Sequence, residues 1–300
     1  MSSPKPFTLI GAPIDSVGGA GGTELSPGIL RAMADWRRVS GEDRGDVPDM
    51  IRDRRRDGET GIIGSDEVIA VTRTLRREIA DLYGKGRRPI LLGGCCTQVV
   101  GALAGMRDAL GCIGVAYLDG HLDLYDGETS PTGEGADMPL ATALGKGPAA
   151  WMAAAGGASL RPEDVALIGP RDHDDAASRG SVLPADFTPA VAMWTHDDIH
   201  VDGGSHVAQH VRSKFEAAAR PFWLAIDVDI LDPEIFPATD YLQPDGLSWE
   251  NFANLVKGLA ASPQLMGLSV ACYNPEKDPG YHAGRRLAGL LIDALEDKTR

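Results

Sequence analysis

Seven short apolar runs, each ending abruptly in glycine, proline, aspartate or histidine, constrain the fold of this 300-residue chain most strongly. Runs this continuously apolar are typical of strands buried on both faces, as in a parallel sheet. Segments with the periodicity of amphipathic helices lie between these runs. In residues 65–84, for example, the apolar side chains recur every three or four positions. The runs are 7–13, 89–96, 113–123, 165–172, 191–198, 223–233 and 266–275. This alternation predicts a single α/β domain over residues 1–300 with a mainly parallel sheet.

The composition narrows the class of protein. The net charge of −14 argues against binding to nucleic acid or to anionic membranes, since both need a basic face. No apolar stretch reaches the length of a membrane span, and the N-terminus has no recognisable signal peptide. Two of the four cysteines, Cys95 and Cys96, are adjacent, which does not fit a disulfide framework. We therefore expect a cytoplasmic enzyme that acts on a small molecule; homo-oligomer formation stays open.

One segment departs from the alternation of strands and helices. Residues 40–61 are densely charged and have no apolar period. This composition predicts a surface loop or a mobile lid over the whole segment.

Acidic residues gather where two of the predicted strands end. Asp119, His121 and Asp123 alternate directly after the run VAYL. A second acidic set follows the run WLAI; it consists of Asp227, Asp229 and Asp232. In open α/β sheets, ligands bind beyond the carboxyl ends of the strands. Burying this many carboxylates together is costly unless a cation compensates, and a pair of divalent metal ions is the natural compensation.

With these motifs the chain resembles the ureohydrolase superfamily, which contains arginases, agmatinases and formimidoylglutamases. DGHLD (119–123) and DVDILDP (227–233) are similar to the two metal motifs of the family, usually written DAHxD and DxDxxDP. Four further segments resemble family segments in the same order. They are GAPIDSVGGAGGTELSPGILR (11–31), GGCCT (93–97), IGPRDHD (168–174) and PATDYLQPDGLSW (237–249). The resemblance covers most of the chain and implies the three-layer α/β/α fold of the arginases.

The resemblance also implies a site for two divalent metal ions, usually manganese. Asp119 and Asp227 would bridge the two ions. Asp123 and residue 96 would complete the coordination of the first ion, and His121 and Asp229 would complete that of the second. Asp232 would orient a loop or a metal-bound ligand. A hydroxide shared by the two ions would attack a planar, amidine-like carbon, and the intermediate would collapse with loss of an amine.

Cys96 stands where the family has a histidine. Because a thiolate can coordinate a divalent ion, we expect Cys96 to be a ligand; the alternative is a small buried side chain beside a weakly held or absent ion. A soft thiolate moves the preference from Mn²⁺ toward Zn²⁺, Fe²⁺ or Co²⁺. A cysteine here is also similar to a branch of the family that acts on modified arginines. Cys95 replaces a family aspartate.

Other departures concern the substrate. Cys272 stands where arginases have a glutamate that pairs with the guanidinium, and a neutral thiol cannot form that pair. The position of the family's proton-shuttle histidine holds Ala136, so Asp137 is expected to act as a general acid or to cap the helix that begins at Met138. By the same resemblance, three residues would contact an amino-acid-like substrate: Asp174, Tyr125 and Thr132.

Together these features predict a metal-dependent hydrolase that cleaves a C–N bond, other than a peptide bond, in a small amidine-, guanidine- or amide-like compound. Without an acid at Cys272, arginine is expected to be a poor substrate and a neutral or weakly basic relative a better one. Two alternatives stay open. One is a hydrolase of a modified arginine such as hydroxyarginine, with another group in place of the missing glutamate. The other is a non-catalytic binding or regulatory protein that keeps the fold and binds no metal.

Overall fold

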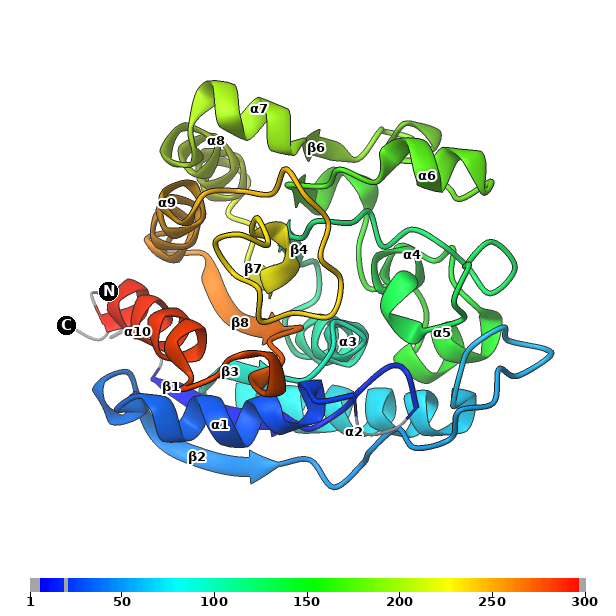
Figure 1. The fold of residues 1–300 in the computed structure, drawn as a ribbon, viewed down its shortest axis with the longest axis horizontal. Helices are drawn as coiled ribbons and strands as arrows, with labels where there is room; N and C mark the ends of the chain where they lie inside the picture. Colours follow the sequence, from blue (N-terminus) through cyan, green and yellow to red (C-terminus); the bar gives the residue numbers. More distant parts are fainter. Residues whose placement is uncertain (1–5, 19–20, 297–300) are drawn as a thin grey trace.

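Eight parallel strands form one sheet in the computed structural model, which describes residues 6–18 and 21–296. Their order across the sheet is β2-β1-β3-β8-β7-β4-β5-β6 (Figure 1), and every neighbouring pair is parallel. The strands are β1 (Phe7–Ala12), β2 (Ser40–Asp46), β3 (Arg88–Gly93), β4 (Gly114–Leu118), β5 (Val165–Ile168), β6 (Ala192–Trp194), β7 (Phe222–Asp227) and β8 (Leu265–Ala271). All seven predicted strands are present, and the prediction of a parallel sheet is confirmed.

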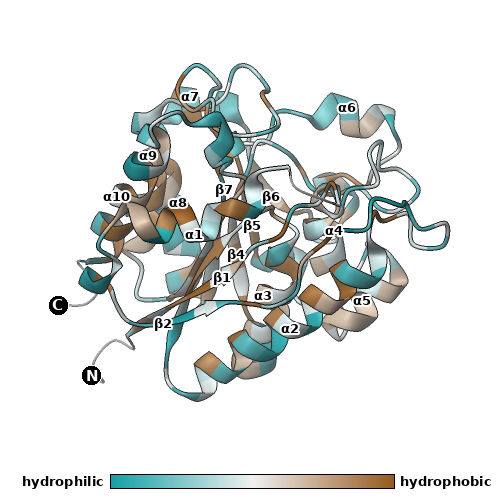
Figure 2. Cartoon of the chain, turned by 60° about the horizontal axis from the view of Figure 1, so that its bottom comes forward, coloured by the Kyte–Doolittle hydropathy of each residue, from teal (hydrophilic) through white to brown (hydrophobic). Residues whose placement is uncertain are grey.

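Helices pack in two groups on the two sides of this sheet (Figures 1 and 2). One group consists of α2 (Ser65–Gly84), α3 (Gln98–Leu110), α4 (Pro139–Ala143) and α5 (Ala149–Ala155). The other consists of α1 (Ser26–Met33), α7 (His196–Asp202), α8 (Gly204–Ala217), α9 (Trp249–Ala260) and α10 (His282–Glu296). The short helix α6 (His173–Ser178) follows β5. The three-layer α/β/α arrangement in a single domain is therefore confirmed.

The strands are apolar because both faces of the sheet are covered. Every residue of β1, β3, β4, β5 and β7 is buried, and Figure 2 shows the apolar colour concentrated in the sheet and on the inner sides of the helices. The buried indole of Trp151 donates a hydrogen bond to Thr72 Oγ1 at 2.7 Å, and that of Trp223 donates to Ser269 Oγ at 3.0 Å. The N–H groups of these two buried indoles are thus paired. No helix of the described ranges is both long and apolar enough to cross a membrane.

The prediction of a loop throughout residues 40–61 is wrong for the first seven residues. Residues 40–46 form β2, which pairs with β1 at the edge of the sheet. An edge strand has one partner and exposes most of its side chains, so it needs no apolar period, and its charges discourage pairing with another chain. Asp43 in this strand also forms an ion pair with Arg31 of α1 at 3.0 Å. The structure assigns no helix or strand to residues 47–61.

Candidate metal centre

The four central strands of the sheet each deliver candidate ligands at their carboxyl ends. Cys96 follows β3 and Cys272 follows β8. The ligands from β7 and β4 are Asp227 and Asp229, and Asp119, His121 and Asp123. Because β3, β8, β7 and β4 are consecutive neighbours and parallel, residues far apart in the sequence meet at one edge of the sheet.

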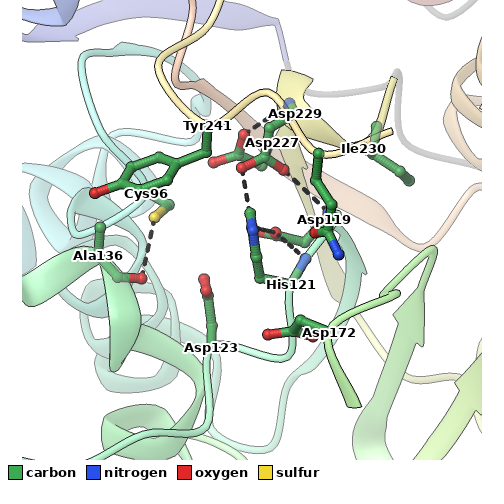
Figure 3. Close-up of polar contacts among 12 residues, drawn as sticks. Cys96, Asp119, His121, Asp123, Ala136, Asp172, Asp227, Asp229, Ile230 and Tyr241 are labelled. Carbon is green, nitrogen blue, oxygen red and sulfur yellow. Dashed lines mark hydrogen bonds and ion pairs between the residues drawn. The ribbon is translucent and has the colours of Figure 1, made fainter. Parts of the chain in front are cut away.

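The first group of candidate ligands consists of Asp119, His121 and Asp229, and the imidazole of His121 lies close to both carboxylates. Its Nδ1 lies 3.1 Å from Asp229 Oδ2 and 3.6 Å from Asp119 Oδ1 (Figure 3). Backbone groups hold both carboxylates: the N–H of His121 donates to Asp119 Oδ1 at 2.8 Å, and that of Gly120 donates to Asp229 Oδ1 at 3.0 Å. One ligand atom from each of the three side chains lies within 4.8 Å of the others. A nitrogen and two carboxylate oxygens at this spacing fit a divalent cation.

The second group consists of Cys96, Asp227 and Cys272, whose ligand atoms also lie within 4.8 Å of one another. The Cys96 thiol donates to the carbonyl of Ala136 at 3.4 Å (Figure 3), and Asp227 Oδ1 accepts from the backbone N–H of Asp229 at 3.0 Å. All three side chains are buried. Cys95 lines the same cavity but belongs to neither group, and burial raises the pKa of its thiol to about 12.

Asp123 belongs to neither three-residue group, but in the close-up its carboxylate points toward the side of Cys96 and His121 (Figure 3). The Tyr117 hydroxyl donates a hydrogen bond to Asp123 Oδ2. The backbone of Asp123 has a φ of 53°, in the left-handed region that non-glycine residues rarely adopt. Such strained conformations concentrate at functional sites.

The electrostatics of these groups favour bound cations. Burial, together with the charges of neighbouring aspartates, raises the pKa of Asp119, Asp123 and Asp227 well above the usual range. Burial lowers the pKa of His121, but Asp229 and Asp119 outweigh it and raise that pKa overall. Burial likewise acts to raise the pKa of Asp229, but His121 outweighs it and lowers that pKa. Since most of these buried carboxylates lack compensation, the oxygen, nitrogen and sulfur donors present fit divalent metal ions.

The shifts predict how the stability of the metal-free protein depends on pH. A raised folded-state pKa contributes stability that is fully present below the ordinary carboxyl pKa of about 4 and is lost as pH rises through the folded-state value. Asp119, Asp123 and Asp227 act in this sense, and the raised pKa of His121 acts likewise above its ordinary value of about 6.5; among the candidate ligands, Asp229 acts in the opposite sense. The melting temperature of chelator-treated protein should therefore fall as pH rises above about 4 toward neutrality. Over the same pH range, the metal-loaded protein should become more stable relative to the metal-free protein, because fewer protons compete with the cation for its ligands as pH rises. Parallel melting profiles for the two forms would contradict this assignment.

The two groups lie in a cavity of about 700 Å³ whose other walls are also acidic. Among the described residues, no lysine or arginine lines it. Beyond the candidate ligands, the lining carboxylates are Asp15, Glu134, Asp137, Asp172, Asp175 and Asp240. Two of them are neutralised from outside the cavity: Asp175 by Arg179 at 2.8 Å and Asp240 by Lys277 at 2.6 Å. The other four have no ion pair in the described part of the chain.

Four of the predicted substrate or proton-transfer residues line this cavity, namely Asp137, Cys272, Thr132 and Tyr125. Asp137 Oδ2 accepts hydrogen bonds from the hydroxyls of Ser130 and Thr132. The helix that follows, α4, begins at Pro139 and has no side-chain cap, so the alternative of a capping role for Asp137 is wrong. The Tyr125 hydroxyl donates to Asp175 Oδ2 at 3.2 Å.

Two other predicted site residues lie outside the cavity. Asp174 is fully exposed on α6 and contacts His173, whereas its neighbour Asp175 lines the cavity, so the expected contact of Asp174 with a substrate is not supported. Asp232 accepts from the backbone N–H groups of Glu234 and Gly246 at 2.9 and 3.2 Å. It therefore organises the loop after β7, which agrees with one of the two roles expected of it.

Sequence reasoning missed Glu134 and Tyr241. Glu134 is buried and accepts hydrogen bonds from the Ser16 hydroxyl at 2.9 Å and from the Tyr241 hydroxyl at 2.8 Å. The ring of Tyr241 lies edge-on to His121, with 6.0 Å between centroids. Burial raises the pKa of Glu134. A glutamate three residues before Asp137, in a glycine-rich loop, was the only available signal.

Arg171 was also missed, and it anchors the loop that carries Tyr241. Its guanidinium donates to the carbonyls of Asp229 and Gln243, both at 2.8 Å, and to that of Pro244 at 3.1 Å. This side chain thereby joins the candidate ligand segment after β7 to the cavity wall.

Comparison with known proteins agrees with this arrangement. A model of the arginase family matches residues 5–295. The chain is 28% identical over 300 residues to an arginase of Bacillus subtilis strain 168, covering 98% of this chain and 99% of the relative. The structure is similar to native arginase from Bacillus caldovelox, with a TM-score of 0.84 and 24% identity over 98% of this chain and 97% of that one. It also shares its fold with agmatine ureohydrolase of Thermoplasma volcanium, with a TM-score of 0.70 and 18% identity over 98% and 91% of the two chains.

Proposed function

The chain belongs to the arginase family, and from this premise we propose that it is a binuclear metal-dependent hydrolase of an amidine or guanidine group in a small cationic compound. One observation carries the proposal. Two groups of ligands, all buried except the half-buried His121, have ligand atoms within 4.8 Å of one another in each group and lie at the carboxyl ends of four adjacent strands. Divalent cations held by these residues would lower the pKa of a nucleophilic water and stabilise developing negative charge.

The protein side chains would orient the substrate and hold protons. With cations bound, Asp119, Asp227 and Asp229 would supply negative charge, and backbone N–H groups hold the carboxylates in position. Asp137 is the best candidate for transferring a proton to the leaving amine. Both of its hydrogen bonds go to Oδ2, which leaves Oδ1 without a hydrogen-bond partner in the described residues.

The charge of the cavity supports a cationic substrate. Asp15, Glu134, Asp137 and Asp172 line it without a basic partner among the described residues. A guanidinium or ammonium group would compensate these charges, since carboxylates form charge-assisted hydrogen bonds with both. The thiol at position 272 led us to expect a neutral or weakly basic substrate. Glu134 changes that expectation, because a cationic group has carboxylate acceptors in this cavity even without an acid at position 272.

The same walls are unfavourable for an α-carboxylate. A substrate carboxylate would meet like charges and no lysine or arginine of the described residues, and such juxtapositions cost several kcal/mol. This argues against arginine, and equally against a modified arginine that keeps its carboxylate. A non-catalytic protein is less well supported, because a buried carboxylate cluster is costly without bound metal.

The test compares agmatine, which is arginine without its α-carboxylate, with L-arginine. Metal-loaded protein should hydrolyse agmatine with a kcat/KM at least about 100-fold higher, corresponding to roughly 2.7 kcal/mol of discrimination. The measurement is steady-state urea release at equal enzyme concentration. Equal rates for the two compounds would show that the cavity has a carboxylate-binding group that we have overlooked.

A further inference from the structure

Two thiols meet in the cavity, and the proposed reaction requires only one of them. The sulfurs of Cys96 and Cys272 lie within 4.8 Å of each other and of a carboxylate oxygen of Asp227. Both cysteines are free and buried, each 8% exposed. They come from the ends of the neighbouring strands β3 and β8, so the sheet itself brings them together.

The backbone of Cys272 is held in an unfavourable conformation that aims it into this group. Its φ is 64°, in the left-handed region; among the described residues that line the cavity, Cys272 and Asp123 are the two non-glycine residues with positive φ. The N–H of Cys272 donates to the carbonyl of Gly94 at 2.7 Å, which ties it to the loop that bears Cys96. Conformations of this kind persist where surrounding structure imposes them, and they concentrate at ligand clamps.

We infer that Cys272 is a second thiolate ligand for the cation that Cys96 and Asp227 hold. This inference rests on the metal dependence proposed above, and it replaces the substrate contact expected of residue 272. Two soft sulfur ligands favour Zn²⁺ or Co²⁺ over Mn²⁺ at this position. The other group, Asp119, His121 and Asp229, offers only oxygen and nitrogen, so the two positions should differ in their metal preference.

Cobalt binding tests the inference with a readout that does not depend on activity. Metal-free protein in reducing buffer is titrated with Co²⁺, and thiolate-to-cobalt charge-transfer absorbance is recorded in the near ultraviolet. Wild type should show a band that Cys96→Ser and Cys272→Ser each reduce to about half and that the double variant abolishes. Cys95→Ser and Cys112→Ser are the matched controls, since Cys95 is buried outside the ligand group and Cys112 is exposed. Neither control should change the band.

Alkylation of wild type provides a second measurement that needs no variant. Bound Zn²⁺ should slow iodoacetamide labelling of the peptides with Cys96 and Cys272 at least about tenfold relative to chelated protein, because a coordinated thiolate is shielded. A band that depends on Cys96 alone, with Cys272 labelled equally in both states, would overturn the inference and leave the proposed function intact. A protein that binds no cobalt at all would overturn both.

Discussion

The substitution Asp119→Asn should lower the kcat/KM for amidine hydrolysis by on the order of 10³-fold. Asp119 is 1% exposed and lies within the first ligand group. Asparagine keeps the shape and can still accept the hydrogen bond from His121, so the fold should persist, but a neutral amide does not offset the charge of a cation. Metal-ion catalysis contributes several kcal/mol, and about 4 kcal/mol corresponds to that loss of rate.

Thermal melting separates loss of metal from loss of fold in this variant. In wild type, a metal concentration 1,000-fold above the Kd stabilises the folded state by about 4.1 kcal/mol. The fall in melting temperature that chelation causes in wild type should shrink or vanish in Asp119→Asn. The control is Asp202→Asn, which changes an exposed aspartate at the end of α7 and should behave like wild type. Full activity and an unchanged chelation shift in Asp119→Asn would remove Asp119 from the metal centre.

The substitution Glu134→Gln should lower the kcat/KM for agmatine by about 10- to 150-fold. The estimate follows from the roughly 1.5–3 kcal/mol that a hydrogen bond to a charged group contributes. Arginine turnover should fall less or rise, because the change also removes a charge that repels its carboxylate. The ratio of kcat/KM for agmatine to kcat/KM for arginine should therefore decrease. Both kcat/KM values are measured from steady-state urea release.

A purely structural role for Glu134 would produce a different pattern. Glutamine accepts the same hydrogen bonds from Ser16 and Tyr241, and burial already disfavours the charged form of Glu134, so the melting temperature should not fall. The control is Glu128→Gln, an exposed glutamate of the same segment that does not line the cavity. Equal losses for agmatine and arginine, together with a lower melting temperature, would assign Glu134 to structure alone.

The sheet could be predicted because buried parallel strands carry a direct sequence pattern. Seven strands stand out as continuous apolar runs, including β6 at the other edge, whereas β2 is an edge strand whose charged residues are solvated. Its pairing with β1 depends on a tertiary contact with no local pattern. A polar edge strand and a polar loop therefore look alike in the sequence.

The candidate ligands of β4 and β7 could also be predicted, since each motif directly follows an apolar run. The proximity of Cys272 to Cys96 could not, because it depends on β8 lying between β3 and β7, an order that the sequence does not contain. The choice between Asp174 and Asp175 depends on the rotation of α6, where one residue turns the side chain by about 100°. Glu134 was missed because its loop has no periodicity from which a buried position can be inferred.

Metal-restored hydrolysis of agmatine tests the central claim most directly. Protein purified without chelator is analysed for metal, assayed for urea release, stripped with chelator and assayed again after Mn²⁺ or Zn²⁺ is returned. We expect about two equivalents of metal per chain, loss of hydrolysis on stripping and its recovery on return of metal. Protein that holds both ions yet hydrolyses neither agmatine nor any other guanidine or amidine, or protein whose hydrolysis survives complete removal of metal, would contradict the assignment as a metal-dependent amidine hydrolase.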